Sequence, residues 1–330
     1  MAEARTAKRT VPVPLRFAIV GAIVLLAAVL VLTWDIGPEP GSKGFWLIVR
    51  MRSVTVVTIL LVAACQGVAT VLFHTATGNR ILTPSIMGFD ALYVLIQTAM
   101  AFFLGAQALS ATDGVPKVLV QSAVMVAFAT LLYGWLFGGR RGSLHVTLLV
   151  GLVLGAGFGT LSSFMQRMLI PGDFDILSAR LFGNISNSNA EYLPVGYGIV
   201  AVILLLVFVR RHRLDVLALG RDTATNLGLN HKREVITTLV IVAVLVSIST
   251  TMVGPMTFFG FIVATLAYQL TGSQEHRRVL PFAVLLGAAI LLGAYFILHH
   301  VFNAAGLVTV IIEFVGGLAF VILLLRKGSM

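Results

Sequence analysis

Residues 17–34 read FAIVGAIVLLAAVLVLTW, and residues 54–73 read VTVVTILLVAACQGVATVLF. Neither stretch carries a charged side chain. Each is long enough for an α-helix to cross the hydrocarbon core of a bilayer, which takes about 20 apolar residues. The first stretch follows a basic segment and has no small-residue cleavage site after it, so we expect it to be retained rather than removed as a signal peptide. Both stretches predict membrane-spanning helices.

The composition extends this prediction to the whole chain. Of the 330 residues, 58% are hydrophobic and only 11% are charged, and the mean hydropathy is +1.00. A soluble fold could not cover so much apolar surface. The single cysteine, Cys65, excludes a disulfide scaffold. The net charge of +10 is spread over short loops rather than gathered on one face, so we expect no nucleic acid as a partner.

Eight further apolar runs bring the expected number of spans to ten. They cover residues 85–104, 118–137, 144–164, 193–209, 235–253, 255–270, 279–298 and 307–325. Gly254-Pro255 predicts a tight turn between the seventh and eighth runs, because proline cannot continue the preceding helix. We therefore predict an all-α polytopic membrane protein with a single transmembrane domain over residues 1–330.

The distribution of basic residues sets the orientation. If residues 1–16 form a cytoplasmic N-terminal segment, 17 of the 23 Lys and Arg residues lie on the inner side and 6 on the outer side. Short cytoplasmic loops carry the excess of Lys and Arg in membrane proteins. An even number of spans then puts the C-terminus in the cytoplasm as well.

Two connections are too long for simple turns. On the outer side, residues 174–186 (FDILSARLFGNIS) predict a short helix, which is either a re-entrant part of a pathway or an interfacial loop helix. On the inner side, residues 210–234 contain two short apolar patterns that end at Gly220 and Gly228, with Asp215 and Asp222 at the expected N-cap positions. We expect two short helices whose exposed apolar side chains need either a protein partner or the membrane surface.

The motifs of enzymes are missing from the sequence. No G-x-x-x-x-G-K-[ST] phosphate loop occurs, so this chain is not expected to hydrolyse nucleotide, and no H-E-x-x-H, C-x-x-C or G-x-S-x-G pattern is present. His299 and His300 are adjacent, and neighbours on a helix point about 100° apart, so we expect packing rather than metal binding. We predict a protein that is not an enzyme and binds no metal or cofactor itself.

A few polar residues within the spans are candidates for a role in transport. Glu313 is either a pathway carboxylate or a structural partner of a polar neighbour. Ser162, Ser163 and Gln166 either line a path or bond back to helix carbonyls. Gly151, Gly155 and Gly159 predict close helix packing.

Arg50 and Arg52 lie on the outer side, against the charge rule. They suit either docking of an acidic soluble partner or contact with lipid phosphate.

Four stretches resemble one family, the permease subunits of ABC importers for iron–siderophores, which are related to the cobalamin and haem permeases. The stretch VLFHTATGNRILTPSIMGFDALYVLIQT is similar to the family's segment between spans two and three, in the branch for ferric catecholate-type siderophores such as petrobactin or anguibactin. LDVLALGRDTATNLGLN resembles its cytoplasmic coupling segment. GPMTFFGFIVATLAYQLTG and VIIEFVGGLAFVILLL resemble its eighth and tenth spans.

The resemblance implies the architecture of a type II ABC importer permease in the bacterial cytoplasmic (inner) membrane. It implies a second, homologous permease subunit, more as a heterodimer than a homodimer, with two ATPase subunits that bind ATP and Mg²⁺ and a siderophore-binding protein outside. The sites it implies fall on the following residues: Asp215, Leu217, Ala218, Leu219 and Gly220 for ATPase coupling, Asn79, Ile81, Ser143 and Leu144 for the inner gate, and Arg50 and Arg52 for docking of the binding protein. The segment after span five would be the outer gate.

The sequence departs from the family pattern at several positions. Span eight has Ala264-Thr265 and Tyr268 where many members have Pro-His and Arg, His74 stands where Gln is common, and Met51 replaces a proline. We expect an ATP-driven importer of ferric siderophore. A haem or cobalamin permease is the near alternative, and an ion-coupled secondary transporter is the alternative from another class.

Overall fold

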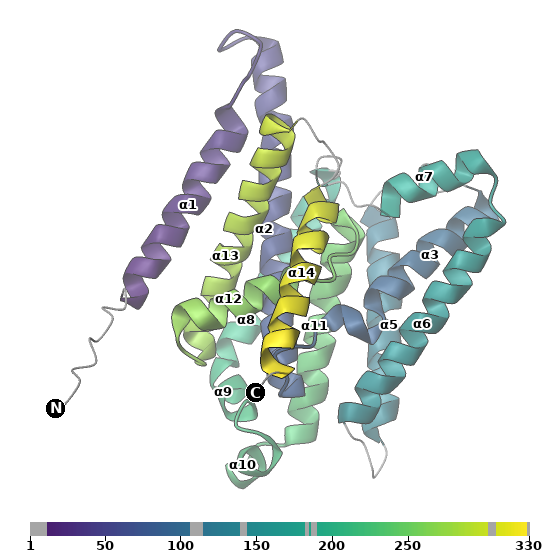
Figure 1. The fold of residues 1–330 in the computed structure, drawn as a ribbon, viewed down its shortest axis with the longest axis vertical. Helices are drawn as coiled ribbons and strands as arrows, with labels where there is room; N and C mark the ends of the chain where they lie inside the picture. Colours follow the sequence, from purple (N-terminus) through teal and green to yellow (C-terminus); the bar gives the residue numbers. More distant parts are fainter. Residues whose placement is uncertain are drawn as a thin grey trace.

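The structure is a computed structural model that describes residues 12–105, 115–138, 144–181, 185, 190–302 and 308–328. Its regular elements are helical (Figure 1). They are α1 (Val13–Thr33), α2 (Lys43–Thr77), η1 (Pro84–Met87), α3 (Phe89–Leu104), α5 (Val115–Gly138), α6 (Leu144–Arg167), α7 (Pro171–Leu181), η3 (Ala190–Tyr192), α8 (Leu193–Val209), α9 (Arg211–Leu217), α10 (Arg221–Asn226), α11 (His231–Val253), α12 (Phe259–Thr271), α13 (His276–Phe296), the π-helical turn η4 (Ile297–Val301) and α14 (Val308–Gly328).

Every apolar run predicted from the sequence coincides with an apolar helix. Within the described residues, five segments are long and apolar enough to cross a membrane: Val13–Thr33, Lys43–Thr77, Leu149–Arg167, His231–Val253 and His276–Val301. A sixth crossing counts if α8 and α9, bent by 62°, are taken together. The remaining four apolar helices, Phe89–Leu104, Leu119–Leu132, Phe259–Thr271 and Val308–Ile322, are shorter. The all-helical membrane fold is confirmed, whereas ten complete crossings stay a prediction.

Helix α2 is the centre of the bundle. In its most apolar 18-residue window, 89% of the residues are buried, against 17% in α1. Small residues let its neighbours approach: a Cβ on Gly67 would lie 3.1 Å from the Ala283 carbonyl oxygen of α13, and one on Gly260 of α12 would lie 2.1 Å from Thr70 Oγ1. The Gln66 Nε2 group donates to Ser249 Oγ of α11 at 3.1 Å. Close packing and interhelical hydrogen bonds of this kind hold membrane helices together.

Helices α3, α5, α6 and α7 form the other side of the bundle (Figure 1). The predicted close packing of α6 occurs at two of its glycines, because a Cβ on Gly151 would lie 3.1 Å from Met87 Cα and one on Gly155 would lie 3.1 Å from Gly88 Cα. Gly88 itself has φ +87°, which favours glycine. A Cβ on Gly159 would meet no atom within 4 Å, so the third glycine of the series packs against nothing in the described chain.

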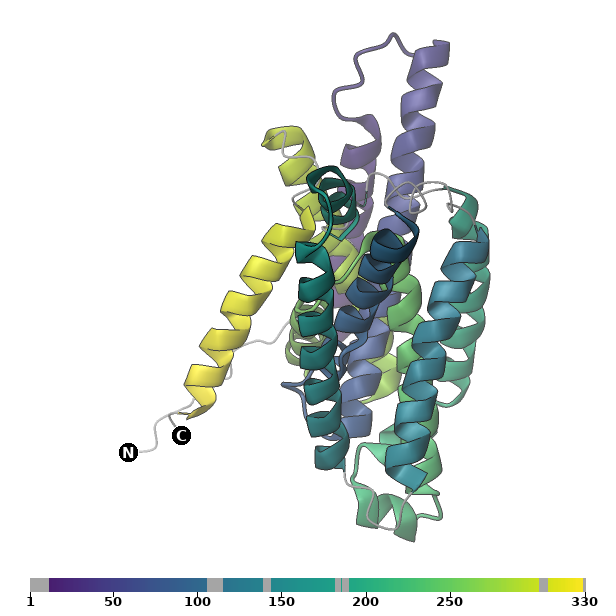
Figure 2. The ribbon, with the colours of Figure 1, turned by 90° about the vertical axis from the view of Figure 1, so that its right-hand side faces the viewer.

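The two ends of the bundle differ. Helices α9 and α10 lie at one end, toward which the start of α1 and the end of α14 also point, while α7 lies across the opposite end (Figures 1 and 2). This arrangement agrees with an even number of crossings. Helix α7 is the short helix predicted for residues 174–186, of which 182–184 and 186 lie outside the described residues.

The predicted turn at Gly254-Pro255 is a break between two helices. Helix α11 ends at Val253, Gly254 has φ +83°, and α12 begins only at Phe259. The non-helical residues 254–258 leave backbone groups that need partners at this depth of the bundle.

Candidate functional site

The end of the bundle that is predicted to face the cytoplasm, called the inner end from here on, carries residues 210–234, called the coupling segment. As predicted, it contains two short helices. Helix α9 begins directly after α8, and α10 ends at Asn226, two residues before Gly228, which has φ +83°. There the N–H groups of Gly228 and Leu229 donate to the carbonyl oxygens of Thr225 and Ala224, both at 2.9 Å, which is a Schellman ending. Gly220, with φ +92°, separates the two helices.

Buried contacts fasten α9 to the bundle. Glu234 of α11 is only 6% exposed, and its carboxylate forms ion pairs with Arg210 and, at 3.3 Å, with Arg213. Leu214 and Leu217 are buried on the same short helix. These contacts give α9 a fixed position relative to the membrane helices.

The predicted N-cap roles of Asp215 and Asp222 are wrong. Helix α9 begins at Arg211, four residues before Asp215, because it continues from α8 after a bend. The Asp215 carboxylate instead accepts the backbone N–H of His276 at 2.9 Å and lies 2.6 Å from His276 Nδ1. Asp222 lies in the first turn of α10, whose N-cap is Gly220.

The apolar residues of the coupling segment divide into two sets. Leu217 is 2% exposed and belongs to the bundle core, whereas Leu219 is 58% and Leu227 62% exposed. Ala218 and Gly220 are exposed beside Leu219. The apolar surface available to a partner is therefore formed by Leu219 and Leu227, one after each short helix.

The residues predicted for the inner gate follow α2 at the same end of the molecule. Gly78 has φ +61° at the end of α2, and Asn79 Oδ1 accepts the N–H of Ile81 at 2.9 Å in a local turn. The Arg80 guanidinium lies over the Tyr268 ring, 4.3 Å from its centroid, and that ring stacks against His74 at 6.2 Å. Two of the positions that depart from the family pattern, His74 and Tyr268, are therefore stacked on each other.

Of the two residues in the second part of the predicted inner gate, only Leu144 is described by the structure. Ser143 lies outside the described residues, and Leu144 is the first residue of α6.

The polar residues predicted for the pathway on α6 are engaged within the chain. Ser162 and Ser163 donate to the carbonyl oxygens of Phe158 and Gly159 at 2.8 and 2.9 Å. Gln166 Nε2 donates to Thr98 Oγ1 of α3 at 3.1 Å. Ser162 is buried and Ser163 is exposed, so Ser163 is the one of the three that faces the outside of this chain.

Glu313 of α14 has a structural partner. Both of its carboxylate oxygens lie 3.2 Å from the Phe258 backbone nitrogen, whose N–H they accept. On the opposite side of the same break, Asp90 Oδ2 accepts from Thr257 Oγ1 at 2.9 Å. The two carboxylates thus satisfy polar groups of residues 257 and 258, where the chain is not helical.

The two outer arginines have different surroundings. The Arg52 guanidinium donates to the carbonyl oxygens of Val31 and Asp35, both at 3.3 Å, and of Trp34, so it caps the end of α1. Arg50, two residues earlier on α2, is exposed. The two arginines, two positions apart in the sequence, therefore lie in different surroundings: Arg52 contacts the end of α1, and Arg50 is exposed.

The histidine pair at the outer end of α13 packs against aromatic rings, as predicted. In the π-helical turn η4, His300 stacks on Phe296 at 5.1 Å and His299 meets Tyr295 edge-on at 5.2 Å. Among the described residues, no three His, Cys, Asp or Glu side chains come together as a metal site.

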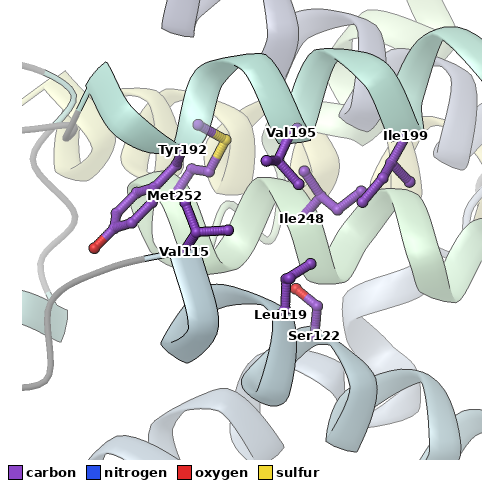
Figure 3. A pocket seen from close by; sticks show the side chains of 9 residues that line it. Val115, Leu119, Ser122, Tyr192, Val195, Ile199, Ile248 and Met252 are labelled. Atoms are coloured by element: carbon purple, nitrogen blue, oxygen red, sulfur yellow. The ribbon is translucent and has the colours of Figure 1, made fainter.

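A small apolar cavity of about 30 Å³ lies between α5, α8 and α11 (Figure 3). It is lined mainly by aliphatic side chains such as Val195, Ile199 and Ile248, with Met252 and the Ser122 hydroxyl at its wall. Such a space has too few polar partners to hold a water molecule. We assign it no role in transport.

Several residues that organise the inner end were not predicted. They are Glu234, His276 and Thr75, each of which joins the coupling segment to a membrane helix directly or through one neighbour. Glu234 carries a signal in the sequence, since it is an acidic residue that directly follows the basic residues Lys232 and Arg233. His276 and Thr75 have no such local signal, because their partners are 61 and 201 residues away.

The fold and these sites define a class: a polytopic helical membrane protein with a short helical segment anchored by buried contacts at one end of its bundle. A solved ABC transporter structure of the metal-chelate type, in an inward-facing conformation, has the same fold, with a TM-score of 0.79 over 95% of this chain and 99% of that chain at 20% identity. The model of the FecCD transport family matches residues 18–326. The chain belongs to the FecCD transport family.

Two relatives bear on the function. The petrobactin import system permease protein FatC of Bacillus anthracis is 44% identical over 289 residues, which is 88% of this chain and 82% of that protein. The petrobactin import system permease protein FatD of the same organism is 26% identical over 296 residues, which is 88% of this chain and 84% of that protein.

Proposed function

We propose that this chain is the permease subunit of an ATP-driven importer that moves ferric siderophore across the bacterial cytoplasmic membrane. The observation that carries the proposal is the 44% identity to a petrobactin import permease over 88% of the chain. By this likeness the substrate is an iron complex of the petrobactin type. The permease itself binds no cofactor, and its role is to provide the path.

Hydrolysis of ATP, with its Mg²⁺, is assigned to a separate ATPase, of which two copies serve one importer. The coupling segment supports this assignment because it exposes Leu219 and Leu227 beyond the bundle while Leu214 and Leu217 hold α9 in place. An ATPase groove that buries the exposed leucines would gain apolar contact area. Movement of the ATPase would then shift the permease between two access states as a rigid-body change.

A second permease subunit completes the path in this proposal. The chain is similar to both FatC and FatD, two permease proteins of one organism, which favours a heterodimer over a homodimer. Helices α6 and α14 suit the contact, since α6 exposes Leu152 and Phe164, and α14 exposes Phe314 and Leu318. Lipid covers whatever part of these faces the second subunit leaves open.

Outside the membrane, a siderophore-binding protein delivers the substrate. We assign its docking first to Arg50, because Arg52 is already engaged with the end of α1. An exposed cation of this kind steers and orients an acidic partner. The inner gate is assigned to Asn79 and Ile81 together with Ser143 and Leu144, and the outer gate to the region of α7.

The contacts of Glu313 count against an ion-coupled secondary transporter. A carboxylate that binds and releases an ion during transport needs to exchange partners, whereas both Glu313 oxygens accept the Phe258 N–H. An importer driven by ATP requires no such exchange.

Complementation of growth tests the proposed substrate. A bacterium that lacks its own petrobactin, haem and cobalamin permeases and cannot make cobalamin would receive this chain with its second permease, ATPase and binding protein. Growth would be measured with ferric petrobactin or haem as the iron source, and separately with cobalamin under conditions in which growth requires it. We expect growth on ferric petrobactin, and none when the chain carries Leu219→Asp. Growth on haem or cobalamin alone would show that this compound, and not ferric petrobactin, is the substrate. Full growth with Leu219→Asp would overturn the assignment of the coupling segment.

A further inference from the structure

A chain of polar contacts runs from the coupling segment into the centre of the bundle, starting at the partly exposed Asp215 and continuing through the buried His276 and Thr75. It begins at Asp215 in α9, whose Oδ1 atom accepts the His276 backbone N–H at 2.9 Å and lies 2.6 Å from His276 Nδ1. His276 is the first residue of α13 and is 2% exposed. One carboxylate oxygen therefore holds both the main chain and the side chain of the residue that starts α13.

The second nitrogen of the same ring reaches α2. His276 Nε2 lies 2.7 Å from Thr75 Oγ1, and Thr75 is 7% exposed. The Thr75 hydroxyl lies within hydrogen-bond distance of both this ring nitrogen and the Val71 carbonyl oxygen, which is 3.0 Å away, and the tautomer of the ring decides which of the two receives its proton. The imidazole of His276 on α13 thus connects to α9 through one ring nitrogen and to α2 through the other.

Thr75 stands just before the segment assigned to the inner gate. Three residues later, at Gly78, α2 ends with φ +61° and the chain enters Asn79 and Ile81. Arg80, between those two residues, is held over the Tyr268 ring of α12 at 4.3 Å. A displacement of Thr75 therefore moves the start of the gate segment against α12.

The second set of polar contacts that holds α9 reaches a different helix. Arg210 and Arg213 pair with Glu234, which lies on α11 and not on α2. The contact through His276 is thus the polar connection that the described residues provide between α9 and the gate end of α2.

Stability alone gives a weak reason for this arrangement. The His276 imidazole is taken out of water, and the Asp215 side chain, which is 32% exposed, is taken out in part. Both changes cost free energy, and apolar side chains of similar volume commonly stabilise a buried site as well or better. What directional hydrogen bonds add is a fixed geometry between the elements that they join. A link of that kind suits elements that must move together.

From these contacts we propose that Asp215, His276 and Thr75 are positioning residues that transmit the movement of α9 to the inner gate. The inference rests on the proposed function, because it assumes that an ATPase displaces the coupling segment. None of the three residues touches substrate in this account. Their loss leaves hydrolysis and assembly in place but separates hydrolysis from gate opening.

The experiment measures siderophore uptake and ATP hydrolysis in the same proteoliposomes, made from the full complex with the binding protein outside. The variants are Asp215→Ala, which removes both contacts to His276, Asp215→Asn, which keeps an acceptor oxygen, and Thr75→Val, which keeps the branched shape but removes the hydroxyl. The control is Glu275→Gln, which breaks the exposed Glu275–Arg278 ion pair (3.2 Å) beside His276.

We expect Asp215→Ala and Thr75→Val to raise the ATP hydrolysed per siderophore about tenfold, the effect of losing about one charge-assisted hydrogen bond. Asp215→Asn is expected to restore most of the coupling, and Glu275→Gln to leave the ratio unchanged. If Asp215→Ala does not assemble, Thr75→Val decides the question alone.

An unchanged ratio in Thr75→Val would overturn the proposal, as would an equal rise in Glu275→Gln. Failure of the proposed function gives a different result, because the unaltered complex would then show no ATP-dependent uptake at all.

Discussion

The Glu313 carboxylate accepts the backbone N–H of Phe258, with both oxygens 3.2 Å from the nitrogen. Phe258 is the last residue before α12 begins, so its N–H has no acceptor in a preceding helical turn. A charged or polar side chain inside a membrane domain is expensive and needs a partner. Here the partner is the main chain at a helix break, which explains an acidic residue in an otherwise apolar helix.

Substitution of Glu313 separates a structural role from a transport role. Glu313→Leu leaves the Phe258 N–H unpaired and should lower the free energy of unfolding by about 1–3 kcal/mol. Glu313→Gln retains an acceptor oxygen and should lose much less. Unfolding by sodium dodecyl sulfate in mixed micelles measures both. If both variants were as stable as the parent and both lost uptake, Glu313 would be a pathway residue instead.

The two outer arginines should give opposite results. Arg52→Ala removes the donors to the end of α1 and should cost about 1 kcal/mol of stability. Arg50→Glu, at an exposed position, should leave stability unchanged but weaken docking of the binding protein about tenfold at low salt, where charge effects are least screened. Binding titrations in nanodiscs at two salt concentrations measure the affinity. Unchanged affinity of Arg50→Glu at low salt would remove Arg50 from the docking surface.

Substitutions of the exposed and the buried leucines of the coupling segment should also have different effects. Leu219→Asp and Leu227→Asp change exposed side chains, so each should alter folding stability by no more than about 0.5 kcal/mol yet abolish co-purification of the ATPase. Leu217→Asp places a charge in the core and should prevent accumulation of folded protein, since an unpaired buried charge costs several kcal/mol. Normal ATPase association of Leu219→Asp and Leu227→Asp would show that the exposed leucines are not the contact.

A matched pair of substitutions tests the close packing of α6 on the η1 turn. Gly155→Leu forces a side chain against Gly88, where a Cβ alone would lie 3.1 Å from Cα, and should destabilise the fold by about 1–3 kcal/mol. Gly159→Leu, one turn along the same helix, places its Cβ where no atom of the described chain lies within 4 Å and should be tolerated. Thermal unfolding of the two variants in detergent gives the comparison. Equal losses of stability would contradict the packing seen at Gly155.

Apolar runs and glycine positions predict much of this structure because they act locally. The helix positions, the break at Gly254-Pro255 and the two short helices of residues 210–234 all follow from side chains within a few residues of each feature. The family resemblance added expected roles for residues that the pattern alone left open, such as Leu219, and those roles stay predictions.

The contacts that the sequence did not reveal are between residues that are distant in sequence. Asp215 was expected to cap a helix, but its partner His276 is 61 residues away, and no periodicity within one helix encodes that pairing. Arg52 meets the end of α1 because the first two helices lie side by side, and Leu217 is buried because α9 folds back on the bundle (Figure 1). Such contacts depend on the packing of the whole domain.

Uptake of iron-labelled petrobactin by proteoliposomes tests the central claim most directly. The vesicles would contain this chain, its second permease and the ATPase, with binding protein outside and ATP inside. The account predicts accumulation of iron inside the vesicles only when both ATP and the binding protein are present. Accumulation driven by an ion gradient without ATP would contradict it.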